Sequence, residues 1–69
     1  MNLPDALRRF RHEKGVSQRQ MATIACISVT QYQNYEYGKS EPTLPILIRL
    51  ADYFDVTLDY LVGRSDKPK

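Results

Sequence analysis

The residues of this sequence that best suit recognition chemistry fall on one side of a short predicted helix, residues 28–37. At about 100° per residue, Tyr32 and Tyr35 share the side of that helix that would face a protein core. The opposite side carries uncharged hydrogen-bonding groups, from Thr30, Gln33, Asn34 and Tyr37. Hydroxyl and amide groups both donate and accept hydrogen bonds, which suits reading base edges in the major groove of DNA. The alternative interpretation is an exposed helix face that is merely polar.

Residue types used in catalysis and metal binding are present, but not at useful spacings. His12 has no second ligand or nucleophile near it in sequence, which indicates a surface histidine. Cys26 lies in a predicted turn between apolar neighbours, where a small packing residue is the usual role. Helix ends and a cap account for three nearby carboxylates, Asp52, Asp55 and Asp59. We therefore expect no catalytic residue, no metal site, no cofactor and no enzymatic activity.

Length and composition limit the protein to one small domain held together by apolar packing. The chain has 69 residues, 42% of them hydrophobic, and a single cysteine, so an internal disulfide is excluded. A chain of this size buries only about 60% of the surface of its unfolded form, which leaves little room for a substrate cleft. The apolar run 44–50 is shorter than the roughly 20 residues that span a bilayer, and residues 1–5 lack signal-peptide features. We expect a cytoplasmic protein without membrane association or a small-molecule substrate.

The net charge of +2 is unevenly distributed along the chain. Residues 1–39 contain six basic and three acidic side chains, whereas residues 40–69 contain four basic and five acidic ones. A basic N-terminal half suits a polyanionic partner. The imbalance is modest, however, and ordinary solvated helix faces produce the same pattern.

Caps and apolar spacing predict three helices in the N-terminal half. The first, residues 3–14, has Pro4 in its first turn and ends at Gly15. Its apolar positions are Leu3, Leu7 and Phe10. A second helix begins after Ser17, which forms a capping box with Gln20. Its inward residues are Met21, Ala22 and Ala25.

Caps and apolar spacing also predict a third helix and two helices in the C-terminal half. Ser28 and Gln31 form a second capping box, and the helix runs to about residue 37 before Gly38 closes it. After a loop at 38–42, Thr43 can cap a fourth helix. This helix has the strongest apolar stripe, made of Leu44, Leu47, Leu50, Ala51 and Phe54. Thr57 caps a short fifth helix that Gly63 ends. The predicted fold class is all-α.

Several segments in order resemble the Cro/phage-repressor type of helix-turn-helix domain, also called the xenobiotic-response-element family. They are 17–22 (SQRQMA), 27–30 (ISVT), 35–39 (YEYGK), 42–44 (PTL), 50–51 (LA) and 55–61 (DVTLDYL). The resemblance covers residues 3–63 and implies a five-helix, lambda-repressor-like bundle that binds double-stranded DNA through its third helix. It also implies a homodimer on a pseudopalindromic operator. The sequence departs from the family at Cys26, where glycine is common, and at Ala25, where a larger aliphatic residue is common.

The resemblance also implies roles for individual residues. Positions that face bases or flanking phosphates are matched by Ser28, Val29, Thr30, Gln33 and Asn34. Positions that meet the phosphate backbone are matched by Gln18, Arg19, Tyr37, Lys39 and Ser40. Gln18 resembles a glutamine that also braces the recognition helix, while Arg11 and Glu36 match a structural ion pair. Val29 lacks a hydrogen-bonding group, so a thymine methyl is the contact open to it. For the remainder, the alternative is ordinary exposed polar residues.

The short fifth helix carries more apolar residues than its own chain would be expected to cover. These are Leu58, Tyr60, Leu61 and Val62, with Ile46 and Tyr53 left over on another side of the fourth helix. Exposed apolar patches commonly mark association surfaces, so the four residues of the fifth helix are predicted to form a two-fold dimer interface. The alternative is that Leu58 and Leu61 cap the core of the monomer.

Together these observations predict a DNA-binding domain at residues 1–63 and a flexible tail at residues 64–69. The expected function is a sequence-specific transcriptional regulator, most simply a repressor of phage or mobile-element type that occupies an operator as a dimer. The alternative is an antitoxin-like or other protein-interaction module in which DNA binding is secondary.

Overall fold

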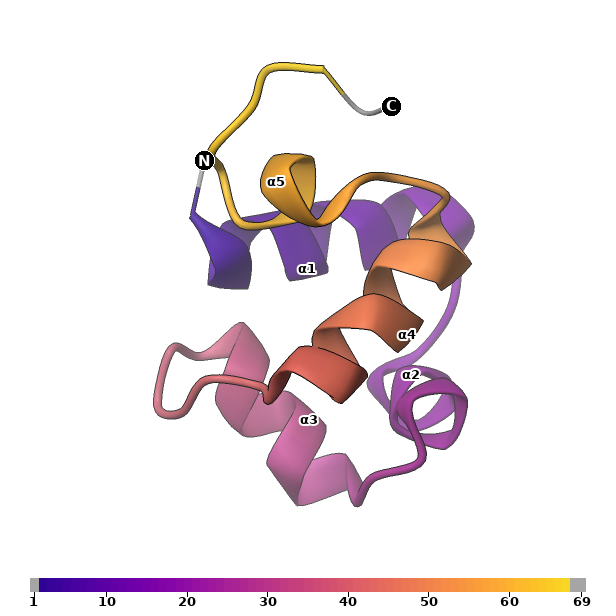
Figure 1. The fold of residues 1–69 in the computed structure, drawn as a ribbon. Coiled ribbons are helices and arrows are strands. Elements are labelled where there is room, and N and C mark those ends of the chain that lie inside the picture. Colours follow the sequence, from indigo (N-terminus) through magenta and orange to yellow (C-terminus); the bar gives the residue numbers. More distant parts are fainter. Residues whose placement is uncertain (1, 68–69) are drawn as a thin grey trace.

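The computed structural model describes residues 2–67, and within them it contains five helices and no strand (Figure 1). In chain order the helices are α1 (Leu3–Lys14), α2 (Gln18–Ala25), α3 (Val29–Glu36), α4 (Leu44–Phe54) and α5 (Leu58–Leu61). Helix α4 crosses the middle of the molecule, with α1 and α5 on one side of it and α2 and α3 on the other (Figure 1). The predicted all-α, five-helix fold is confirmed.

Short side chains at the helix ends determine where the helices begin. Ser17 and Gln20 form the predicted capping box, because Ser17 Oγ accepts from the Gln20 N–H and Gln20 Oε1 accepts from the Ser17 N–H. Asn2 caps α1 by accepting from the Asp5 N–H at 3.0 Å. Gly15 ends α1 in the left-handed conformation, with φ of 69°. These caps leave only a short connection between α1 and α2.

Four details of the helix ends differ from the prediction. Thr43 precedes α4 but makes no side-chain capping hydrogen bond. Pro45 lies in the first turn of α4, where backbone N–H groups have no partner within the helix, so the N–H that proline lacks costs nothing. Ser28 accepts from the Gln31 N–H, but the Gln31 amide donates to the Tyr35 hydroxyl at 2.8 Å instead of completing a box. Helix α3 ends at Glu36 and α5 ends at Leu61, each about one residue earlier than predicted.

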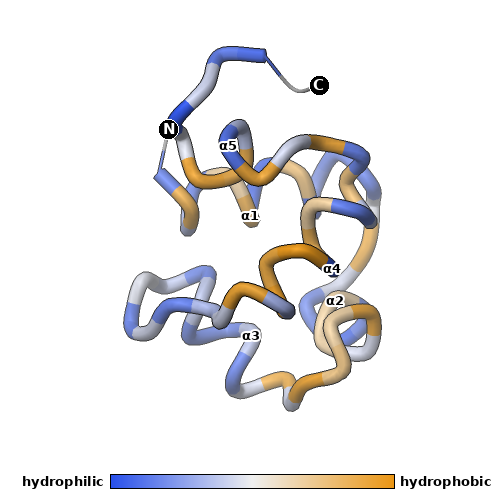
Figure 2. Tube along the Cα trace, in the orientation of Figure 1, coloured by the Kyte–Doolittle hydropathy of each residue, from blue (hydrophilic) through white to orange (hydrophobic). Residues whose placement is uncertain are grey.

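The core lies between α4 and the other helices. Hydrophobic residues follow α4 through the middle of the molecule, while α3 and the loop after it are mostly hydrophilic (Figure 2). The buried hydrophobic residues are Ala6, Leu7, Phe10, Met21, Ala22, Ala25, Tyr32, Tyr35, Ile46, Leu50, Ala51, Phe54 and Leu61. The Phe10 ring centroid lies 5.4 Å from that of Phe54 and 5.7 Å from that of Tyr60, which joins α1, α4 and α5.

The buried face of α4 includes Leu50, Ala51 and Phe54 of the predicted stripe, but the rest of the stripe differs. Leu44 is 59% exposed and Leu47 is only partly buried, whereas Ile46, expected outside the core, is 8% exposed. The buried residues Ile46, Leu50 and Phe54 are spaced by four, so they lie along one side of the helix. The predicted set had equally good helical spacing, and only the position of α4 against its neighbours distinguishes the two.

The two ends of the chain are described only in part. Residue 1 and residues 68–69 lie outside the described residues, so the predicted tail at 64–69 is covered only to residue 67. The Arg64 N–H donates to the Asp59 carbonyl at 2.7 Å, and Ser65 Oγ accepts from the Lys67 N–H at 3.1 Å. Among residues 2–67, no helix has the length and apolar character that crossing a membrane requires.

Candidate nucleic-acid interface

A tight turn joins α2 to α3. Helix α2 ends at Ala25 and is capped by Cys26, whose backbone is left-handed with φ of 62°; the Ile27 N–H donates to the Ala22 carbonyl at 2.9 Å. This is a helix-ending geometry that glycine adopts most easily. Cys26 is exposed, so its predicted role as a packing residue is wrong. The requirement at this position is therefore a residue that can adopt the left-handed backbone conformation, and not one that fills space in the core.

Helix α3 buries one side and presents the other. Tyr32 is fully buried and Tyr35 is 3% exposed, which confirms their predicted inward orientation. Thr30 is exposed, and Gln33 and Asn34 are half-buried. The other predicted contact positions here are also accessible: Ser28 is exposed, Val29 is half-buried and Tyr37 is 56% exposed. The exposed side of α3 is therefore uncharged and rich in hydrogen-bonding groups.

A buried ion pair fixes the end of α3 to α1. Arg11 Nε donates to Glu36 Oε2 at 2.6 Å, and Arg11 Nη2 donates to Glu36 Oε1 at 3.3 Å. Arg11 Nη1 also donates to the Val16 carbonyl at 3.1 Å. The Glu36 side chain is fully buried, so the pair is shielded from solvent. The structure thus brings together the two residues that the resemblance paired.

The surroundings of Glu36 keep it ionised. Burial alone would raise the pKa of Glu36, but hydrogen bonds from Arg11 and Gln18, together with the positive charge of Arg11, outweigh burial and lower the pKa below its ordinary value. Hydrogen bonding to Glu36 raises the pKa of Arg11. Burial, followed by the interaction with Glu36, raises the pKa of the Tyr32 phenol, which therefore stays neutral. The site combines an ionised carboxylate with a permanent cation.

Gln18 connects this ion pair to the exposed side of α3. Its Nε2 donates to Glu36 Oε1 at 3.1 Å, and its Oε1 accepts from Gln33 Nε2 at 3.1 Å. Gln18 is the first residue of α2 and is half-buried. Its position therefore matches the bracing role that the resemblance implies, and the contact with Gln33 is a feature that sequence reasoning missed.

Arg8 is a residue at the end of α3 that sequence reasoning missed. Its guanidinium donates to the backbone carbonyl of Glu36 and pairs with Asp5. A helix C-terminus leaves carbonyls unsatisfied, and a cation placed there is favourable. The available signal was spacing, because Arg8 precedes Arg11 by one helical turn on α1 and so faces the same neighbour.

The remaining predicted phosphate contacts are exposed on either side of α3. Arg19 lies in the first turn of α2, and Tyr37, Lys39 and Ser40 lie in the segment after α3. Lys39 Nζ lies 6.0 Å from the centroid of the Tyr37 ring. These exposed cationic and hydroxyl groups therefore belong to the helix before α3 and to the segment after it.

The predicted dimer residues are less available than expected. Leu61 is fully buried in the monomer, so its assignment to a dimer interface is wrong. Leu58, Tyr60 and Val62 are half-buried, and Tyr60 stacks on Phe10. Packing of α5 against α4 and α1 provides the cover that the sequence alone did not reveal. The large aliphatic side chains that are exposed lie instead on α4, where Leu44 is 59% and Ile48 is 42% exposed.

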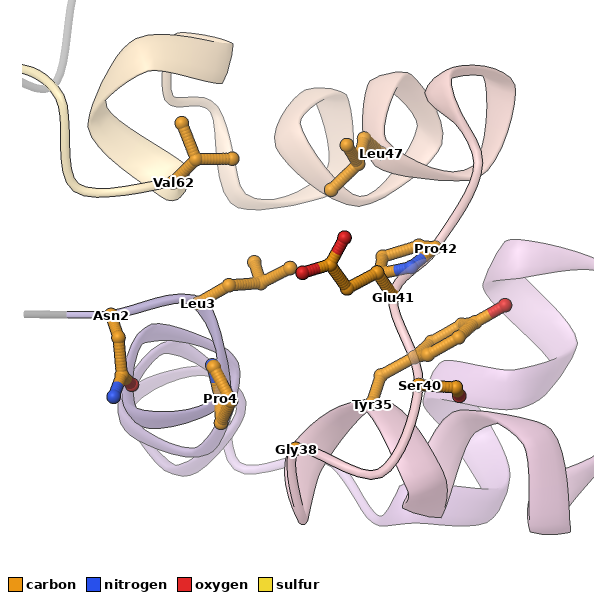
Figure 3. Close-up of a pocket in the computed structure, with 10 residues that line it drawn as sticks. All are labelled: Asn2, Leu3, Pro4, Tyr35, Gly38, Ser40, Glu41, Pro42, Leu47 and Val62. Carbon is orange, nitrogen blue, oxygen red and sulfur yellow. The ribbon is translucent and has the colours of Figure 1, made fainter.

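Figure 3 shows a pocket of about 430 Å³ between the start of α1, the loop after α3 and α4. It is lined by the start of α1, the end of α3 and the loop after it, one residue of α4, and the residue that follows α5; the lining includes Leu3, Pro4, Tyr35, Pro42, Leu47 and Val62. Glu41 is its charged lining residue. Within residues 2–67, no three His, Cys, Asp or Glu side chains gather to hold a metal ion.

The fold and the uncharged face of its third helix define a helix-turn-helix domain. The family model for that domain matches residues 7–61, and the chain belongs to the helix-turn-helix family of Cro and phage-repressor type. Members of this family are DNA-binding transcriptional regulators and not enzymes.

Named relatives of the chain are regulators of transcription. It is 36% identical over 64 residues to the cryptic phage CTXphi transcriptional repressor RstR of Vibrio cholerae, covering 93% of this chain and 57% of that protein. It is 42% identical over 65 residues to the transcriptional regulator AnsR of Bacillus subtilis, covering 94% of this chain and 55% of that protein. The chain therefore spans little more than half the length of these relatives.

Solved structures share the fold. A transcriptional regulator from Listeria innocua superposes with a TM-score of 0.88 at 30% identity, covering 96% of this chain and 62% of that one. The P22 c2 repressor, solved in complex with a synthetic operator, superposes with a TM-score of 0.87 at 18% identity, covering 94% of this chain and 98% of that one. The second likeness concerns the fold alone.

Proposed function

We propose that this chain binds double-stranded DNA in a sequence-specific manner and represses transcription by occupying an operator. The observation that carries the proposal is the uncharged, hydrogen-bonding side of α3, held in a fixed orientation by the Arg11–Glu36 pair. Thr30, Gln33 and Asn34 are the side chains we assign to base edges. Ser28 and Val29 flank them at the start of the helix.

Groups around α3 support docking on the sugar–phosphate backbone. Arg19 and Lys39 supply positive charge, while Tyr37 and Ser40 supply hydroxyl donors, and all four side chains are exposed. Gln18 keeps an amide hydrogen beyond the one donated to Glu36. Such contacts fix the register of a protein on the duplex without reading its sequence.

Repression is the form of regulation that the relatives favour. RstR is a phage repressor by name, and it shares 36% identity with this chain over 64 residues. A bound domain blocks an operator by occupancy alone, without a second activity. The function proposed is that of this domain, which matches only about half of its relatives' length.

We further propose that two copies occupy one operator, with their recognition helices about 34 Å apart. The partly exposed residues Leu58, Tyr60 and Val62 are the assigned contact. Val62→Glu should reduce cooperative filling of two half-sites while sparing the affinity for one. Leu44→Glu introduces the same charge on the exposed side of α4 and is the matched control. If only Leu44→Glu loses cooperativity, the interface lies on α4 and not on the fifth helix.

The experiment that tests the function combines site selection with salt dependence. The chain is used to select duplexes from a random pool, and its affinity for a selected and an unrelated duplex is then measured over a range of salt. A sequence-specific binder enriches one site and weakens log-linearly with salt, and Lys39→Ala should lower the salt slope by about one unit. If no site is enriched and binding to duplex is negligible, the chain is a protein-interaction module instead.

A further inference from the structure

Hydrogen bonds connect the buried carboxylate of Glu36 to the exposed side of α3 through two side-chain amides. Gln18 Nε2 donates to Glu36 Oε1 at 3.1 Å, and Gln33 Nε2 donates to Gln18 Oε1 at 3.1 Å. Each amide has a direction, because Nε2 only donates and Oε1 only accepts. The orientation of one group in this series therefore determines the orientation of the next.

Glu36 sets the direction at the buried end. It is ionised and held by two hydrogen bonds from Arg11. An ionised carboxylate only accepts, so the Nε2 end of the Gln18 amide must face it. Reversing Gln18 would place two acceptors in contact in a partly buried site, where unsatisfied polar groups are costly. Gln18 consequently presents Oε1 to Gln33, and that oxygen requires the Nε2 end of Gln33.

We propose that Glu36, acting through Gln18, fixes the orientation of the Gln33 amide and thereby makes Gln33 select adenine over guanine. The inference rests on the proposed function, because it requires α3 to lie in the major groove. Gln18 and Glu36 are positioning residues in this scheme, and Gln33 is the residue that touches the base.

The pattern of hydrogen-bonding groups explains the choice of base. With one Nε2 hydrogen given to Gln18, Gln33 keeps one N–H and a free Oε1. Adenine presents an acceptor at N7 and a donor at N6, which this pair of groups matches. Guanine presents acceptors at N7 and O6, which would need both N–H groups of a reversed amide. Fixing the amide therefore favours adenine.

The experiment measures binding of the full chain to duplexes that differ at a single base pair. That base pair is located as the one whose discrimination disappears in Gln33→Ala. The wild-type chain should prefer adenine to guanine there by about 5- to 150-fold. Gln18→Met keeps a side chain of similar length but removes both the amide N–H donor and the amide oxygen acceptor. It should reduce the preference for adenine to within roughly threefold. Discrimination at the base pair read by Thr30 should not change.

Two further variants separate orientation from general damage. Gln31→Met removes an amide of the same helix that bonds Tyr35 instead of Gln18, and should keep the adenine preference. Glu36→Gln offers either end of an amide to Gln18 and should relax the preference. If Glu36→Gln does not fold, comparing Gln18→Met with Gln31→Met still shows whether the adenine preference depends on the Gln18 amide.

A measurement on the free protein tests directly the hydrogen bonds that connect Glu36, Gln18 and Gln33. In the free protein, NMR should show slowed exchange of a Gln33 side-chain amide hydrogen in the wild type and in Gln31→Met, but not in Gln18→Met. Unprotected Gln33 in the wild type, or an unchanged adenine preference in Gln18→Met, would overturn the inference while leaving DNA binding intact. A chain that selects no duplex at all would overturn the proposed function as well.

Discussion

Glu36 Oε2 lies 2.6 Å from Arg11 Nε, although the two residues are 25 positions apart and belong to α3 and α1. Because the Glu36 side chain is fully buried, neither water nor salt competes effectively for this contact. The pair therefore holds the last turn of α3 at a fixed position against α1. That arrangement has consequences for stability, for pH dependence and for recognition.

Removing one partner of the pair should be more damaging than removing both. Arg11→Met leaves a buried carboxylate without its cation, and should cost about 3–5 kcal/mol in the free energy of unfolding. The double variant Arg11→Met/Glu36→Leu should recover much of that loss, because no charge remains buried. Urea denaturation of the three proteins gives the comparison. A double variant less stable than Arg11→Met would contradict the assignment of the pair as a compensated buried charge.

Acidification should weaken the fold through Glu36. Its pKa in the folded protein is lowered from the ordinary value of 4.5, so its contribution is fully present above that pH and is lost as the pH falls through the folded pKa. The free energy of unfolding should therefore decline below about pH 4.5. Glu36→Gln should be less stable at neutral pH and should show a shallower decline. Parallel pH profiles for the two proteins would rule out this role.

The two sides of α4 should respond very differently to truncation. Leu50 is fully buried, so Leu50→Ala should cost about 2–5 kcal/mol. Leu44 is 59% exposed, so Leu44→Ala should change the stability by no more than about 0.5 kcal/mol. Thermal or urea unfolding measures both. Similar losses at the two positions would show that α4 is rotated relative to the structure described here.

The turn between α2 and α3 should accept glycine with a gain in stability. Cys26 has φ of 62°, a conformation that costs a residue with a side chain roughly 1 kcal/mol more than glycine. Part of that gain is offset because glycine loses more chain entropy on folding. Cys26→Gly should therefore raise the free energy of unfolding by about 0.5 kcal/mol or slightly more. Cys26→Ala retains the strained conformation and is the control, so an equal gain in both variants would refute the explanation.

Local signals in the sequence predicted the helices and one side of α3. Helix caps and the two tyrosines on one side of α3 depend only on neighbours within one or two turns. The sequence spacing alone therefore predicts the capping roles of Ser17, Ser28 and Gly15 and the inward orientation of Tyr32 and Tyr35. The resemblance to a known family supplied the pairing of Arg11 with Glu36. Spacing could not, because the two residues meet only when α1 packs against α3.

Features that depend on contacts between helices were predicted less well. Leu44 and Ile46 belong to two stripes of equal helical quality, and the position of α4 decides which is buried. Leu61 was assigned to a dimer contact because the cover that α4 and α1 give to α5 cannot be read from the fifth helix alone. The Gln18–Gln33 contact was missed for the same reason, since it joins two helices across the turn.

The central claim is that the exposed side of α3 reads base pairs. The most direct test compares Thr30→Ala and Asn34→Ala with the wild type on a selected site and on an unrelated duplex. Each variant should lose about 1–3 kcal/mol of binding free energy on the selected site and far less on the unrelated duplex. Equal losses on the two duplexes would contradict the claim, because those side chains would then contribute to affinity without reading sequence.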